Sequence, residues 1–349
     1  MKRIVLSGFL MLVFGMHGYS QTDTVKAKMV DEQEAEKYYN IGVDNLNAKR
    51  NAEALTAFNK AIEIKPAFEK AYYNRGVAFL DMLLYKQAIE DFNKAIGINP
   101  ANDMYYYFRG QANYQNGDKG AAQEDYSKAI GINPKNHEAC YYRGGLKFER
   151  EDYSGAAADF TLAIEAKADY AYAYNDRGSA KRMQNDLNGA IADYSKAIQL
   201  NPGLAFVYNN LGSARKKNND LKGAVEAYTT AVTMKSDYYI AYNNRGIAKY
   251  EQGDYKGALE DFSRAIQQKS DYAFAYNNRA AARYKQKDYK GSVDDCTKAI
   301  QLNSAYGYAY MNRAIAEEML RDEAGSCTDM KKAAGMGVDQ AKNYLSDCN

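Results

Sequence analysis

Histidine and tryptophan are scarce in this 349-residue chain, which has two histidines and no tryptophan. Catalytic Ser-His-Asp and Cys-His sets need a histidine with ordered partners, and beyond the first twenty residues His137 stands alone. The ligand spacings of zinc sites, such as CxxC or HxxxH, do not occur in the sequence. We therefore expect no enzyme, and no bound metal or other cofactor.

Apolar runs long enough to span a membrane are also missing. The run from Ile4 to Met16 has thirteen residues, whereas a helix needs about 20 to cross a bilayer. It follows Lys2 and Arg3 and precedes the small residues Gly18 and Ser20, which is the order of parts in a secretory signal peptide.

These features predict a signal peptide over residues 1–20 that is cleaved between Ser20 and Gln21. The mature chain would be periplasmic or secreted, would begin with a polar N-terminal segment at 21–34, and would not insert into the membrane. The alternative is that the apolar run stays in place as an N-terminal membrane anchor.

Charge of one sign is not in excess either. Without residues 1–20 the chain has 44 Lys and Arg residues against 44 Asp and Glu residues. Nucleic-acid binding normally needs a basic surface that neutralises phosphates. Nucleic acid is therefore not an expected partner.

What the sequence does contain is a repeat with a period of 34 residues. Internal repeats of this length indicate a solenoid. Glycine recurs at this period seven times, alanine recurs nine times, and all four prolines are in phase. The glycines are Gly42, Gly76, Gly110, Gly144, Gly178, Gly212 and Gly246, and the prolines are Pro66, Pro100, Pro134 and Pro202.

On these positions the sequence resembles the tetratricopeptide repeat (TPR) family. When Ala35 is counted as position 1, the large aromatic of position 4 is present in eight of the nine copies, from Tyr38 to Tyr310. The resemblance implies an all-α fold, a right-handed superhelical solenoid of helix-turn-helix repeats, with nine repeats over 35–337. We expect a capping helix over 338–349 to cover the end of the stack.

Two positions of the repeat change together. Position 7 is Arg and position 23 is Asp in the same seven copies, whereas the other two copies have Ile41 with Ala57 and Leu211 with Ala227. This covariation predicts a structural ion pair between the two helices of a repeat. The pairs are Arg75–Asp91, Arg109–Asp125, Arg143–Asp159, Arg177–Asp193, Arg245–Asp261, Arg279–Asp295 and Arg313–Asp329.

The four cysteines divide into two kinds. A turn at Gly335 and Gly337 would bring Cys327 near Cys348, and an exported chain would join them in a disulfide. The alternative is two unpaired thiols. Cys140 and Cys296 occupy core positions of the repeat, where we expect small buried side chains.

The resemblance places the first helix of each repeat on the concave face of the superhelix, mainly through positions 2, 5, 6, 9, 12 and 13. Position 6 is often Asn, and position 2 is apolar in the C-terminal half. This pattern is similar to the asparagine ladder of O-linked N-acetylglucosamine transferases and suggests a peptide-binding groove. Its residues are Asn40, Asn74, Asn210, Asn244, Asn278, Asn312, Phe206, Ile240 and Phe274.

The alternative for these asparagines is a structural role, in which they stabilise turns or bond neighbouring helices. The family's carboxylate clamp is not expected, because position 6 is never Arg in this sequence. We expect a non-enzymatic scaffold that binds extended peptide segments of other proteins. The alternatives are a glycan-binding module, or a structural spacer that self-associates through its open ends.

Overall fold

The computed structural model describes residues 21–345 and 348, with side chains from residue 28 onward. Within these residues the chain forms nineteen helices and no strand, which confirms the all-α solenoid. The signal peptide predicted at 1–20 lies outside the described residues. None of the helices described combines the length and the apolar character that crossing a bilayer requires.

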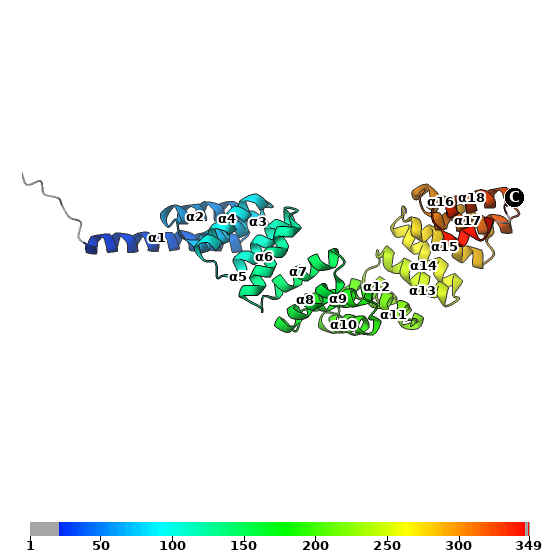
Figure 1. Ribbon diagram of the computed structural model, residues 1–349, viewed down its shortest axis with the longest axis horizontal. Helices are drawn as coiled ribbons and strands as arrows, with labels where there is room; N and C mark the ends of the chain where they lie inside the picture. Colours follow the sequence, from blue (N-terminus) through cyan, green and yellow to red (C-terminus); the bar gives the residue numbers. More distant parts are fainter. Residues whose placement is uncertain (1–20, 346–347, 349) are drawn as a thin grey trace, which may run out of the picture. The chain divides into compact units, whose positions relative to one another are not determined.

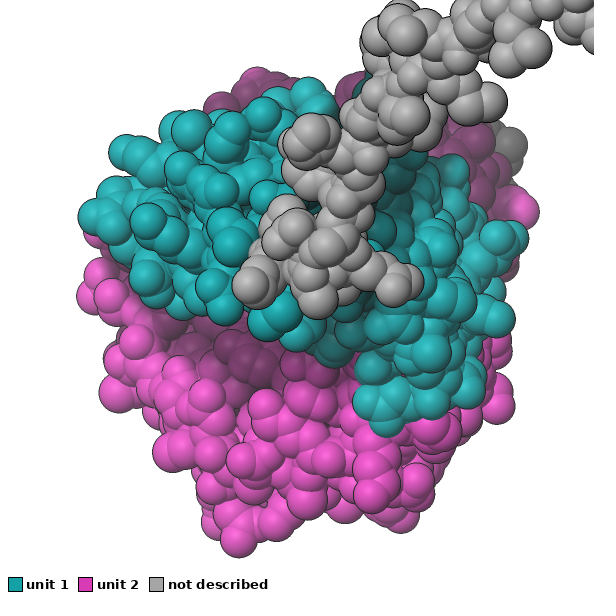
Figure 2. Space-filling model, turned by 90° about the vertical axis from the view of Figure 1, so that its left-hand side faces the viewer, with its two compact units in different colours: residues 1–133 teal, residues 134–349 magenta. Residues whose placement is uncertain are grey.

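The chain divides into two compact units, residues 1–133 and 134–349, which are coloured separately in Figure 2. The first unit holds three helix pairs, each closed by a short turn (Figure 1). Its helices are α1 (Gln21–Asn47), α2 (Asn51–Ile64), α3 (Glu69–Asp81), α4 (Tyr85–Ile98), α5 (Asp103–Gln115) and α6 (Lys119–Ile132).

The second unit holds six further pairs and a short final helix. Its helices are α7 (His137–Glu149), α8 (Tyr153–Ala166), α9 (Ala171–Met183), α10 (Leu187–Leu200), α11 (Ala205–Lys217), α12 (Leu221–Met234), α13 (Tyr239–Glu251), α14 (Tyr255–Gln268), α15 (Ala273–Lys285), α16 (Tyr289–Leu302), α17 (Gly307–Met319), α18 (Glu323–Gly335) and α19 (Asp339–Lys342). The first helices of successive repeats, α7 to α17, contact one another along this unit. They therefore form one continuous layer.

The turn inside each repeat has a fixed backbone conformation. Its middle residue has a positive φ, a conformation suited to Gly or Asn, as at Gly253 (φ 84°) and Asn185 (φ 67°). The next residue is Asp in seven repeats, and its carboxylate accepts a hydrogen bond from a backbone N–H of the second helix, as Asp186 accepts from Gly189 N at 2.9 Å. Such N-caps contribute about 1 kcal/mol each.

The second repeat departs from this turn chemistry. Leu83 takes the positive φ of 62°, and Leu84 stands where seven of the repeats have the capping Asp and makes no side-chain cap. Met82, Leu83 and Leu84 are all exposed, Leu83 by 68%. A leucine in this conformation costs about 1–2 kcal/mol, so the turn is a weak point of the first unit.

The core of each repeat rests on a close contact between position 8 and position 24. A Cβ added to Gly76 would lie 2.8 Å from the ring of Phe92, and one added to Gly246 would lie 2.6 Å from the ring of Phe262. Glycine therefore lets the ring of the second helix approach the first helix. The two repeats with Ala at this position, at Ala280 and Ala314, have the smaller Cys296 and the flexible Met330 in place of the ring.

The N-terminal end of the stack has a helix whose extent the sequence did not predict, and the C-terminal end differs from the sequence-based expectation. Helix α1 begins at Gln21, so the polar segment at 21–34 is helical and continuous with the first repeat. The capping helix expected over 338–349 is shorter: α19 covers Asp339–Lys342, and the chain continues in turns such as Tyr344 N to Ala341 O at 3.2 Å. Asn343 directly after the helix favours this early end, because Asn is a weak helix former.

The short cap still covers the last repeat. Val338 and Ala341 are buried and pack with Tyr310, Met330 and Ala333 of α17 and α18. A disulfide joins Cys327 of α18 to Cys348, with 5.3 Å between their Cα atoms. The cap is thus fixed to the last repeat both by apolar packing and by a covalent bond.

Candidate functional site

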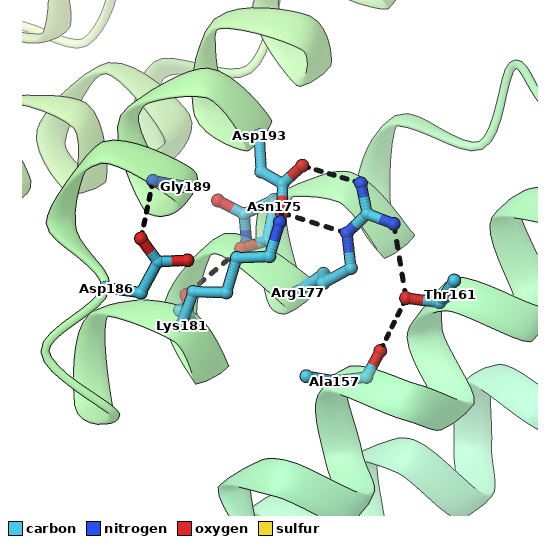
Figure 3. Close-up of polar contacts among 9 residues, drawn as sticks. Ala157, Thr161, Asn175, Arg177, Lys181, Asp186, Gly189 and Asp193 are labelled. Atoms are coloured by element: carbon cyan, nitrogen blue, oxygen red, sulfur yellow. Dashed lines mark hydrogen bonds and ion pairs between the residues drawn. The ribbon is translucent and has the colours of Figure 1, made fainter.

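The Arg and Asp of positions 7 and 23 form bidentate ion pairs, as Figure 3 shows for Arg177. Its Nε and Nη2 donate to Asp193 at 2.9 and 2.7 Å, and its Nη1 donates to Thr161 Oγ1 of the preceding repeat at 3.2 Å. The guanidinium also lies over the ring of Tyr174, 5.3 Å from its centroid. One arginine therefore connects three helices.

The same pair is present in each of the seven repeats that the sequence singled out. The Nη2 atom of Arg75 lies 2.6 Å from Asp91 Oδ1, and that of Arg245 lies 2.6 Å from Asp261 Oδ1. These carboxylates are buried, with side chains 6% and 4% exposed. Because the pairs are enclosed between helices, they serve the fold rather than a ligand.

Sequence reasoning missed a second cation on several of these carboxylates. Position 11 places Lys181 Nζ 2.8 Å from Asp193 and Lys249 Nζ 2.9 Å from Asp261. A basic residue four positions after the arginine was the available signal, since both lie on one side of the helix. In the sixth repeat, where Leu211 and Ala227 replace the pair, Arg215 donates to Gly223 O instead.

The predicted groove asparagines of the second unit form a chain of amide contacts between repeats. Each of these position-6 asparagines donates its Nδ2 to the Oδ1 of the position-5 asparagine one repeat earlier. We call these residues the amide ladder. The bonds are Asn210 to Asn175 at 3.0 Å, Asn244 to Asn209 at 3.0 Å, Asn278 to Asn243 at 3.0 Å and Asn312 to Asn277 at 2.9 Å.

These bonds show that the ladder has a structural role. The position-5 amides are buried, Asn243 being 4% exposed, and a buried amide needs a partner. The position-6 amides are half-buried. An Asn amide has two donor hydrogens and an oxygen with two lone pairs, so one donated bond leaves a position-6 amide further capacity for a ligand.

Apolar side chains stand one helical turn before the ladder amides, at position 2 of the first helices. Ile240 is 37% exposed and Phe274 is 48% exposed, while Phe206 is partly buried against the core. Tyr172 and Tyr308 continue the row and are 45% and 49% exposed. The amides and this row form the ladder face of α9, α11, α13, α15 and α17.

The two groove asparagines of the first unit are placed differently. Asn74 donates to the hydroxyl of Tyr39 at 2.9 Å, because position 5 is Tyr in these repeats. Asn40 is exposed on α1 and lines a shallow surface pocket with Glu36, Asp44 and Lys65. The structure therefore shows the amide-to-amide bond in the second unit and an amide-to-phenol bond in the first.

The ladder of the second unit is continued at Asp176, which the sequence analysis did not single out. Asp176 occupies position 6 of the fifth repeat, and its carboxylate accepts from Tyr141 Oη at 2.6 Å and from Asn175 Nδ2 at 2.8 Å. Burial raises the pKa of this carboxyl, and the two hydrogen bonds oppose the rise. The available signal was an acid where later repeats have Asn.

The remaining cysteines are buried thiols, as expected from their core positions. Cys140 and Cys296 are both fully enclosed and unpaired. Burial raises the pKa of the Cys140 thiol to about 11, so it is protonated at neutral pH and is a poor nucleophile. No group of three or more potential metal ligands occurs among the residues that the structure describes.

The fold and the ladder face define a class, a helical-repeat solenoid with a periodic surface of amides and rings. Family models agree with it over most of the repeats. A tetratricopeptide repeat model matches residues 69–102, a second matches 105–136 and 207–238, and a TPR repeat model matches 48–82, 178–219 and 248–287. The chain belongs to the tetratricopeptide repeat family.

Solved structures share the fold at low sequence identity. A tetratricopeptide repeat protein from Parabacteroides merdae is 17% identical, with a TM-score of 0.57 over 70% of this chain and 97% of that one. The C-terminal part of a TPR protein from Cytophaga hutchinsonii is 18% identical, with a TM-score of 0.57 over 69% and 98% of the two chains.

A third similar structure is the Cut9–Hcn1 hetero-tetramer of APC/C, at 14% identity and a TM-score of 0.57 over 90% of this chain and 76% of that one. None of the curated proteins compared with the chain matches it. TPR proteins are generally non-catalytic scaffolds for protein–protein interaction, and the repeats that the family models match support such a role.

Proposed function

We propose that this protein binds extended peptide segments of partner proteins along the ladder face of its second unit. The observation that carries the proposal is the regular pairing of an exposed apolar side chain with a half-buried amide, one helical turn apart, as in Phe274 with Asn278. An extended backbone offers N–H and C=O groups for the amides and side chains for the apolar row.

The spacing of the repeats suits an extended ligand. Packed helices lie about 10 Å apart, and an extended chain advances about 3.3 Å per residue, so one repeat corresponds to about three ligand residues. The amides from Asn210 to Asn312 occupy four successive repeats. We expect a bound segment of at least about nine residues.

We further propose that the protein acts outside the cytoplasm, in the periplasm or after secretion. The leader-like sequence at 1–20 supports this location. The disulfide between Cys327 and Cys348 is independent support, since such bonds persist in oxidising compartments. Fractionation of cells that produce the chain, with N-terminal sequencing, tests it; recovery of uncleaved chain in the cytoplasm would refute it.

Binding is tested with a phage-displayed library of random dodecapeptides, panned on the chain from residue 21 onward. Replacing Tyr172, Phe274 and Tyr308 by Ala should abolish enrichment while leaving the fold intact, because the three side chains are about half exposed. The matched control replaces the exposed Leu162 and Met234 of the second helices α8 and α12.

The proposal fails if the control variant loses as much binding as the ladder-face variant, or if no peptide is enriched. A glycan array, probed in parallel with the same three proteins, addresses the alternative. Glycan signals that the ladder-face substitutions remove would favour a carbohydrate ligand.

A further inference from the structure

The fifth repeat carries a carboxylate where the next four carry an amide. Asp176 stands at position 6, in register with Asn210, Asn244, Asn278 and Asn312. Its hydrogen-bond partners are the neutral groups of Tyr141 and Asn175. Within the described second unit, the cations Arg177 and Lys181 of the same helix are both engaged with Asp193.

The fold does not require a charge at this place, as the first unit shows. Tyr39 and Asn74 stand in the same relation as Tyr141 and Asp176, at position 5 of one repeat and position 6 of the next. There the amide donates to the phenol oxygen at 2.9 Å, whereas Asp176 accepts from the phenol at 2.6 Å. An amide can therefore form the same contact without burying a charge. Burying a charge is unfavourable unless a cation compensates it.

Aromatic rings cluster around Tyr141, the phenol that donates to Asp176. Tyr141 contacts Tyr142 and Tyr170, with ring centroids 5.4 and 5.0 Å apart. Burial raises the pKa of Tyr170, and the nearby Tyr142, Glu138, Asp176 and Tyr172 add to the rise. Tyr172 stands one helical turn before Asp176 on α9, on the same side of the helix. Tyr142 and Tyr172 are 38% and 45% exposed. The cluster is therefore open to a ligand at the level of the ladder face.

The charged groups that act on the Tyr170 ring are two acids, Glu138 and Asp176, and one exposed cation, Lys167. The Glu138 carboxylate lies 3.0 Å from His137 Nδ1. Lys167 lies over the ring of Tyr170 with Nζ 5.3 Å from the centroid, and it is exposed to solvent. Aromatic faces attract ammonium and guanidinium groups, more strongly when the site is partly desolvated, and a carboxylate adds direct charge pairing.

We propose that Asp176, with Tyr142, Tyr170 and Tyr172, forms a pocket for one lysine or arginine side chain of the bound peptide. This inference rests on the proposed peptide-binding function and adds a chemical requirement to it. Asp176 precedes Asn210 by one repeat, so the basic residue lies about three positions from the segment that meets Asn210.

The test uses the same dodecapeptide library, panned on the wild type, on Asp176→Asn and on the control Glu226→Gln, an exposed acid of α12. Wild-type and control selections should enrich peptides with Lys or Arg at one fixed position, about three residues from an apolar one. Asp176→Asn should select peptides without that preference. Circular dichroism of each variant confirms that it is folded.

A pair of synthetic peptides then gives the magnitude of the effect on binding. For the strongest selected peptide, replacing the basic residue by norleucine should weaken binding to the wild type about tenfold and leave binding to Asp176→Asn nearly unchanged. The pocket proposal is wrong if the wild type enriches peptides without a preference for Lys or Arg. It is also wrong if that preference is unchanged in Asp176→Asn. Either result leaves the proposed peptide groove unaffected. If no peptide is enriched on any protein, the groove itself fails and the pocket with it.

Discussion

Gly246 of α13 lies directly against the ring of Phe262 of α14, with room for no side chain between them. The same contact recurs in each repeat that has glycine at position 8, and it sets how closely the two helices of a repeat pack. The contribution of this contact to stability can be separated from the effect of helix propensity, because the chain also has a helical glycine that contacts no neighbouring side chain. Gly145 of α7 has no atom within 4 Å of where its Cβ would stand.

Gly246→Ala should therefore destabilise the protein by about 1–3 kcal/mol, since overpacking outweighs the gain in helix propensity. Gly145→Ala should stabilise it by up to about 1 kcal/mol through propensity alone. Urea denaturation followed by circular dichroism measures both. Equal effects of the two substitutions would show that the ring contact does not set the packing.

The turn of the second repeat should be open to improvement. Leu83→Gly relieves a left-handed leucine, and Leu84→Asp supplies the missing N-cap. Each change should raise the stability of the first unit by about 1–2 kcal/mol, because the third repeat already uses Gly117 and Asp118 in this way. Hydrogen exchange of amides in α3 and α4 reports this directly, and unchanged protection would contradict it.

The ion pair of the fifth repeat should behave as a unit. Asp193→Ala alone leaves Arg177 without its buried partner and should cost about 3–5 kcal/mol. The double change Arg177→Leu with Asp193→Ala reproduces the Leu211 and Ala227 of the next repeat and should recover most of that loss. A double-mutant cycle on unfolding free energies gives the coupling; additive losses would mean that the pair is not coupled.

Stability should depend on pH through Asp176. Burial raises the pKa of this carboxyl in the folded state, so the folded protein holds a proton at pH values where the unfolded chain has lost it. Stability from this group is therefore present at low pH and is lost as pH rises through the folded pKa.

Asp176→Asn removes this loss. The variant should be more stable than the wild type at pH 7. The difference should shrink as pH falls through the raised folded pKa of Asp176 and should be gone below about 4, the ordinary value for Asp. Glu138 is common to both proteins and cancels in the comparison. Thermal denaturation from pH 3 to pH 8 measures the difference, and a gap that is constant with pH would exclude Asp176 as its source.

The helices and the ion pairs could be predicted because they leave periodic traces in the sequence. Arg177 and Asp193 vary together across repeats, and such covariation identifies contact without coordinates. The N-terminal extension of α1 was missed because residues 21–34 have no apolar stripe, although good helix formers such as Lys28 and Glu34 favour a helix there. The C-terminal helix was overextended because its apolar pattern continues past Asn343.

The site was predictable only in outline. The repeat pattern placed Asn210 and Asn244 on the first helices, but it did not show whether their amides face a ligand or a neighbouring helix. That depends on the distance between successive repeats, which brings Asn244 within 3.0 Å of Asn209. Asp176 could not be interpreted without Tyr141, whose hydroxyl reaches it from 35 residues earlier in the chain.

The disulfide between Cys327 and Cys348 also has a consequence for how the stack comes apart. In a linear array each repeat is supported by its neighbours, so the helices at an end fray first. Here the last pair, α17 and α18, is held under a cap whose chain is covalently tied to α18. In an oxidising environment, the helices should therefore unfold from α1 inward. Reduction of the disulfide should allow unfolding to begin at α19 as well.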